Sequence, residues 1–207
     1  MIGDESIREY LDRTASHAPA PGGGAAAALQ LAQAAALTAM SARFTTGANF
    51  AQHAPLVERV LAAAQPLIAE SLDVGDADAE AFARVADAYA LPQGSAAEKD
   101  ERTAAIQAAL VEATEPPQQL IELARSISAL GEELLGCANP NILSDITAAA
   151  AAARAAATIA QATLEINLAS VKDSSARRTI EDRIHAADDV IDFCNGLIVR
   201  TREEIAR

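Results

Sequence analysis

The sequence predicts an all-α protein, an antiparallel up-and-down bundle of seven to eight helices. Half of the residues are hydrophobic (51%), alanine is far above its usual share, and aromatic residues make up only 3%. Alanine has the highest helix propensity and loses no side-chain entropy in a helix. No segment alternates with a period of two, as a strand would. The composition does not change along the chain, so we expect one domain over residues 1–207.

Capping residues and helix breakers set the predicted boundaries in the first quarter of the chain. Ser6 and Glu9 form a capping box that opens a short first helix, and the Pro/Gly-rich segment 19–24 follows it. The next helix, from about residue 25 to 44, is rich in alanine and has no charged residue before Arg43. We therefore place this helix at the centre of the bundle.

Prolines and glycines divide the remainder into further helices. Pro55 is suited to the first turn of a helix, and we expect Pro66 to kink that helix. After Gly75 a separate helix is predicted over residues 76–91. The remaining helices are predicted over residues 95–114, 117–137 and 144–171, and from about 176 to the C-terminus. The connections are short, which favours antiparallel neighbours.

Charge and cysteine content limit the classes of partner and compartment. The formal net charge is −13, with 29 acidic and 16 basic residues, so nucleic acid and an anionic membrane are not expected partners. Cys137 and Cys194 are far apart in sequence, the first ten residues do not form a signal peptide, and the alanine run 148–153 is too weakly apolar to span a bilayer. We expect a cytoplasmic protein. Small side chains bury little area each, so we also expect a homo-oligomer.

The first candidate site is Pro21, Gly22, Gly23 and Gly24, directly before the long alanine-rich helix. Glycines allow positive φ angles and let a ligand approach the backbone. The free N–H groups at the start of the helix favour an anion or an electron-rich group. The alternative is a tight connection in which glycine permits close helix packing.

Two further segments place polar side chains where a reaction could use them. Asn139, Asn141, Ser144 and Asp145 share a loop that ends at a helix N-terminus, although their spacing alone favours turn formation and helix capping. Asp78 is a carboxylate among alanines, and a solvated charge is the alternative there. The histidines lack metal-ligand spacing and no nucleophile motif is present, so we expect no metal site.

Taken together and in order, these features resemble the family of cyclodeaminases and methenyltetrahydrofolate cyclohydrolases. The resemblance covers roughly residues 4–205. It includes Pro21-Gly22-Gly23-Gly24, Asp78-x-x-Ala81-Phe82, Leu91-Pro92, Arg102 with Ile106-Gln107, Pro117, Asn139-x-Asn141-x-x-Ser144-Asp145 and Ile166-Asn167-Leu168. It implies a helical bundle, a homodimer, a folate site near the dimer interface, and a tetrahydrofolate derivative as the substrate without a metal or redox cofactor.

The chemistry implied by the resemblance assigns roles to these residues. Both reactions pass through a tetrahedral carbon between two nitrogens, and a carboxylate can transfer the proton and stabilise a nearby cation. Asp145 is the first candidate and Asp78 the second. Asn139, Asn141, Ser144 and Asn167 are expected to orient the pterin, and Pro21 with Gly22–Gly24 should line the same pocket.

The sequence also departs from the family pattern. Ala20 and Ala25 stand where hydroxyl residues are usual, Ala48 and Gln93 where lysine is usual, and Thr163 where asparagine is usual. Two alternatives therefore stay open beside the folate reaction. One is an enzyme of the same fold acting on a non-folate cyclisation or C–N bond substrate, and the other is a non-catalytic binding protein.

Overall fold

A computed structural model describes all 207 residues. It contains seven α-helices and three short 3₁₀ turns, and no strand. The α-helices are α1 (Ile7–Thr14), α2 (Gly23–Phe44), α3 (Ala54–Ala90), α4 (Ala96–Glu112), α5 (Glu115–Leu135), α6 (Leu143–Ser170) and α7 (Ser174–Ile205). The 3₁₀ turns are Ile2–Asp4, Ala48–His53 and Pro140–Ile142.

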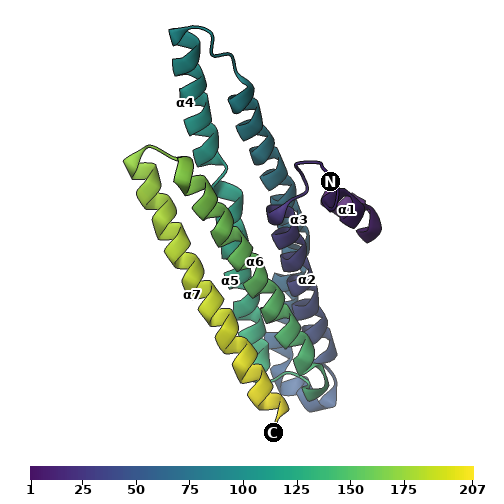
Figure 1. Ribbon diagram of the computed structural model, residues 1–207. Helices are drawn as coiled ribbons and strands as arrows, with labels where there is room; N and C mark the ends of the chain where they lie inside the picture. Colours follow the sequence, from purple (N-terminus) through teal and green to yellow (C-terminus); the bar gives the residue numbers. More distant parts are fainter.

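The helices α2 to α7 form one elongated bundle, and α1 lies against its side (Figure 1). Helix α2 packs on α3, α5 and α6, and α7 packs on α6 and α5. Helices α4 and α5 run one after the other in the same direction, beside the long α3 (Figure 1). The prediction of an all-α bundle is confirmed. Six helices build it, fewer than the seven to eight expected, because α1 stays outside and two predicted helices are one.

That merged helix is α3, which runs unbroken through Pro66 and Gly75. The predicted boundary at Gly75 is therefore wrong. A β-carbon at position 75 would lie 2.6 Å from Cβ of Ala28 and 2.9 Å from Cδ1 of Ile2, so the glycine permits close contact with α2 and the N-terminal turn. Buried residues on both sides of the glycine, Val74 before it and Ala81 after it, keep the helix continuous across a residue of low propensity.

The break between α4 and α5 occurs where the prolines predicted it. Pro116 and Pro117 have no N–H, so the carbonyl of Ala113 lacks the donor that a continuous helix would supply. The side-chain amide of Asn167 donates to this carbonyl instead, at 3.1 Å. Through this hydrogen bond, α6 is attached to the junction of α4 and α5.

The interior is built mainly from alanine. In α2 and α6 the residues Ala27, Ala34, Ala156 and Ala160 are fully buried. Because these side chains are small, the two helices approach closely and still fill the space between them. Both helices are also long and apolar enough to cross a membrane by length and composition, and core helices of a bundle share that property.

Candidate functional site

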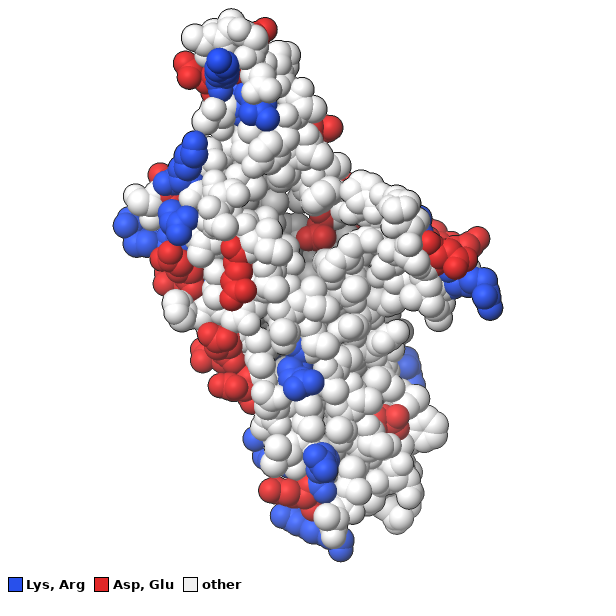
Figure 2. Space-filling view, in the orientation of Figure 1, with Lys and Arg blue, Asp and Glu red and all other residues white.

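A cavity of about 480 Å³ lies between the start of α2, the C-terminal half of α3, the end of α4 and the last turns of α6. Its volume is in the range of pockets that bind small organic molecules. Figure 2 shows a hollow in this face of the bundle with acidic atoms at its floor and an uncharged surround. The lining residues are Pro19, Ala20, Gly22, Gly23, Gly24, Ala25, Asp78, Ala79, Ala81, Phe82, Val85, Leu110, Ala113, Thr163, Ile166, Asn167 and Ser170.

Asp78 is the one charged residue of this lining. Its side chain comes from α3 and is half-buried, and burial raises the pKa of its carboxyl group above the ordinary value for aspartate. No hydrogen bond within the chain reaches this carboxylate, and no group of three or more His, Cys, Asp or Glu side chains is placed to hold a metal ion. A carboxylate with a raised pKa in an uncharged cavity is suited to accepting and returning a proton.

The glycines before α2 leave room for this carboxylate. A β-carbon at Gly24 would lie 2.0 Å from Oδ2 and 2.7 Å from Oδ1 of Asp78, whereas one at Gly23 would meet Cγ2 of Ile159 at 3.4 Å. None of these glycines has a positive φ angle; among all residues only Gly47 has one. The prediction that these glycines are needed for positive φ angles is therefore wrong. Position 24 requires glycine because the carboxylate of Asp78 lies too close to its backbone for a β-carbon.

The α6 wall of the cavity carries most of its uncharged polar groups. Thr163, Ile166, Asn167 and Ser170 follow one another at helical spacing and share one face of α6. The Asn167 amide donates to Ala113, and its amide oxygen accepts no hydrogen bond within the chain. That oxygen is therefore available to accept a hydrogen bond from a ligand.

Apolar side chains give the cavity a surface for a flat ring. Phe82 is 50% exposed and Ile166 is 73% exposed, although both are large and hydrophobic. Phe82 and Val85 follow Asp78 by four and seven residues, so all three face the cavity from α3. Phe82, Val85 and Ile166 were not predicted as site residues; the helical spacing from Asp78 was the available signal for the first two.

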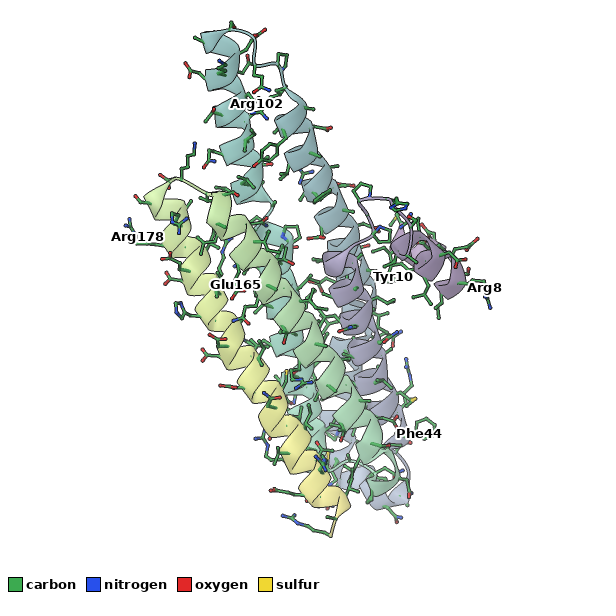
Figure 3. All side chains as sticks on the ribbon, in the orientation of Figure 1. Arg8, Tyr10, Phe44, Arg102, Glu165 and Arg178 are labelled. Carbon is green, nitrogen blue, oxygen red and sulfur yellow. The ribbon has the colours of Figure 1, made fainter.

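The predicted cluster of Asn139, Asn141, Ser144 and Asp145 lies at the other end of the bundle. The Asn139 amide donates to the carbonyl of Phe44, the last residue of α2, at 3.1 Å. Its side-chain oxygen accepts from the backbone N–H of Asn141 at 3.1 Å, which caps the 3₁₀ turn. Figure 3 shows Phe44 at the lower end of the bundle, away from the cavity.

We expected the glycines before α2 and the residues around Asp145 to line the same pocket. Within one chain this expectation is wrong. Helix α2 has 22 residues, so its two ends are roughly 33 Å apart. The structure brings Gly22, Gly23, Gly24, Asp78 and Asn167 together and leaves the cluster of Asp145 apart from them. Pro21 is buried and lines a neighbouring pocket of about 290 Å³.

Comparisons with known proteins agree with this fold. The family model described as formiminotransferase-cyclodeaminase matches residues 6–186. A methenyltetrahydrofolate cyclohydrolase of Methylorubrum extorquens is 32% identical over 99% of this chain and 98% of its own length. A formimidoyltransferase-cyclodeaminase of Rattus norvegicus is 32% identical over 87% of this chain, which spans 34% of that longer protein.

A solved structure has the same architecture. The crystal structure of a formiminotetrahydrofolate cyclodeaminase from Thermotoga maritima superposes with a TM-score of 0.85 at 27% identity, over 100% of this chain and 98% of that one. The matches of sequence and of structure thus extend over almost the whole bundle, including the cavity. The chain belongs to the formiminotransferase-cyclodeaminase family.

Proposed function

We propose that the cavity binds a tetrahydrofolate derivative and that the protein is a methenyltetrahydrofolate cyclohydrolase. The observation that carries this proposal is the lone, desolvated carboxylate of Asp78 in an otherwise uncharged cavity. The substrate would contribute a cationic methenyl bridge, and a carboxylate in a cavity of low polarity attracts such a cation strongly. The full-length similarity to a cyclohydrolase supports the same assignment.

In this reaction a water molecule attacks the methenyl carbon, which lies between the N5 and N10 nitrogens of the folate. Asp78 accepts a proton from the water as the new C–O bond forms, which gives a tetrahedral carbinolamine. The protonated Asp78 then donates this proton to N5 as the C–N5 bond breaks. The remaining hydroxyl proton leaves to solvent, and the product is 10-formyltetrahydrofolate.

A second reaction is favoured by the likeness to the Thermotoga cyclodeaminase. Here N10 of 5-formiminotetrahydrofolate attacks the formimino carbon. The formimino group reacts in its protonated amidinium form, so one proton that moves from N10 to the departing nitrogen lets neutral ammonia leave, and the cationic methenyl compound forms. Because the same carbon and the same two nitrogens react, Asp78 can relay this proton from the same position.

The remaining cavity residues fit the binding of a pterin ring. Phe82 and Ile166 offer apolar surface to the flat ring, and the free amide oxygen of Asn167 can accept from a pterin N–H group. Gly24 keeps the backbone of α2 within reach of the reacting groups. The orientation of the ring is thus set from three helices.

The decisive experiment incubates the purified protein with 5,10-methenyltetrahydrofolate and follows the loss of its near-ultraviolet absorbance. A parallel sample with 5-formiminotetrahydrofolate tests for the appearance of the same absorbance and of ammonia. Turnover above the spontaneous rate in the first assay supports the cyclohydrolase, and in the second the cyclodeaminase. Tight binding without turnover of either compound would indicate a binding protein, and neither binding nor turnover would indicate a non-folate substrate.

We also propose that the protein acts as a cytoplasmic homodimer and needs no metal ion or redox cofactor. Exposed apolar side chains such as Val199 and Ile205 are available for burial in an interface. Sedimentation at micromolar concentration should give twice the mass of 21.4 kDa. Turnover should survive treatment with a chelator.

A further inference from the structure

The junction between α4 and α5 leaves one backbone carbonyl without a backbone donor. The chain keeps turning through the junction, since Ala113 and Thr114 both have right-handed helical φ and ψ angles and the N–H of Gln118 donates to the carbonyl of Thr114 at 3.3 Å. In a helix the carbonyl of Ala113 would accept from the N–H at position 117. Proline stands there and has no N–H, so the carbonyl of this buried residue needs a donor from elsewhere.

Asn167 supplies that donor from α6. Its side-chain amide nitrogen donates to the carbonyl of Ala113 at 3.1 Å. The two ends of an asparagine amide have nearly the same shape but only the nitrogen can donate, so a carbonyl decides which end faces it. Asn167 also lines the main cavity. The hydrogen bond therefore holds the nitrogen at the junction and leaves the oxygen as the free end for a ligand.

Thr163 presents a second acceptor, one helical turn earlier on the same face of α6. Its hydroxyl donates its only proton to the carbonyl of Ile159 at 3.0 Å, so toward a ligand its oxygen can only accept. Thr163 lines the main cavity together with Asn167 and Asp78, and an ionised carboxylate is also only an acceptor. Three polar side chains of the lining thus offer acceptors to the N–H groups of a ligand.

We infer that Asn167 and Thr163 determine specificity by accepting hydrogen bonds from N–H groups of the substrate ring. We assign Pro117 as a positioning residue, which keeps Asn167 in its accepting orientation because it gives the carbonyl of Ala113 no backbone donor. The inference rests on the proposed function, which places the pterin ring in this cavity. A pterin has adjacent N–H donors at N3 and at its 2-amino group, and a site built to bond such donors discriminates against a ring that lacks them.

The positioning role of Pro117 can be tested by thermal melting without a ligand. Asn167→Leu keeps the approximate size of the side chain and removes the donor. The carbonyl of Ala113 then has no partner, and the melting temperature should fall by about 2–8 °C. Adding Pro117→Ala to this variant supplies an N–H four residues after Ala113. About half or more of the loss should then be recovered, because the new N–H replaces the missing donor.

Pro116→Ala is the matched control for this recovery. Both prolines are buried and lie in the first turn of α5, but a helical N–H at position 116 would donate to the carbonyl of Glu112 and not to that of Ala113. Added to Asn167→Leu, Pro116→Ala should recover none of the lost melting temperature. Equal melting temperatures of the two double variants would overturn the positioning role of Pro117.

The specificity is tested with two substrates, 5,10-methenyltetrahydrofolate and its analogue with a methyl group in place of the 2-amino group. In the wild type, kcat/KM should be about tenfold higher for the natural compound. Asn167→Leu should reduce this ratio to about twofold, and Thr163→Val and Pro117→Ala should each lower it by about threefold. Pro116→Ala should leave it unchanged. The ratio is insensitive to a loss of folded protein, because both substrates meet the same enzyme sample.

The outcomes distinguish this inference from the proposed function. Equal kcat/KM values of the wild type for the two substrates would overturn recognition of the amino group, while the folate activity stands. A wild-type ratio in Asn167→Leu and Thr163→Val would overturn the role of these side chains. Absence of turnover of the natural compound would overturn the proposed function and the recognition with it, whereas the melting temperatures still decide the role of Pro117.

Discussion

The carboxylate of Asp78 lies against the backbone of Gly24, so closely that a β-carbon at position 24 would lie 2.0 Å from its Oδ2 atom. The two residues come from different helices and are 54 positions apart in the sequence, from 24 to 78. Their contact joins the start of α2 to the one charged side chain of the cavity. The carboxylate can occupy this position only because residue 24 has no side chain.

Gly24→Ala should displace Asp78 and reduce turnover by about 10²-fold, because a shift of roughly 1 Å in a reacting group has an effect of that size. Overpacking should cost about 1–3 kcal/mol in the free energy of unfolding, partly offset by the better helix propensity of alanine. Turnover and thermal melting measure the two effects.

Gly23→Ala is the matched control for that change. Its β-carbon would meet Ile159 at 3.4 Å, an ordinary contact distance. We expect turnover within a few-fold of the wild type. Equal losses of turnover in the two variants would show that the loop as a whole, and not the contact with Asp78, requires glycine.

Asp78→Asn should stabilise the protein at neutral pH. Burial raises the pKa of this carboxyl group, so between its ordinary and its raised pKa the folded protein binds more protons than the unfolded chain. The contribution of Asp78 to stability therefore decreases as the pH rises through that window and stays unfavourable above it. Asparagine has no such contribution.

Urea unfolding of the wild type and of Asp78→Asn at a series of pH values measures this difference. The advantage of the asparagine variant should be largest at neutral pH and should shrink as the pH falls through the window. A constant difference at every pH would mean that the ionisation of Asp78 does not oppose folding.

Gly75→Ala should destabilise the bundle. The new β-carbon would lie 2.6 Å from that of Ala28 on the facing helix, where neither backbone can yield easily. Overpacking of this kind costs about 1–3 kcal/mol. Gly136→Ala is the control, because nothing lies within 4 Å of its β-carbon and its φ angle is −69°. It should keep or slightly raise the melting temperature, and equal melting temperatures of the two variants would contradict close packing at Gly75.

Most of the helix boundaries could be predicted from local sequence. The predicted capping box of Ser6 is present, the helix predicted from residue 95 begins behind Ser95, and Pro116 with Pro117 begins a new helix as expected. Gly75 could not be interpreted in this way. Its effect depends on the helix packed against it, and tertiary contacts there outweigh local propensity.

The candidate site was predicted only in part, because local sequence does not show which helix ends meet. Helices α2 and α6 are antiparallel, so the start of α6 with Asp145 meets the end of α2, and the last turns of α6 with Asn167 meet the glycines at its start. A helix N-terminus with several polar residues therefore gave the stronger local signal at Asp145. The buried carboxylate of Asp78, within a run of other acidic residues, gave the weaker one.

The most direct test of the central claim is a turnover assay of Asp78→Asn beside Asp145→Asn, with 5,10-methenyltetrahydrofolate and the loss of its near-ultraviolet absorbance as the readout. Both changes remove one carboxylate and keep the side-chain shape. Asp78→Asn should reduce turnover by about 10²–10⁴-fold with the fold intact, because the proton-transfer group is lost. Asp145→Asn should keep wild-type turnover and change stability by no more than about 0.3–1 kcal/mol through the helix dipole. Wild-type turnover in Asp78→Asn, with turnover lost in Asp145→Asn, would contradict the assignment of the reaction to this cavity.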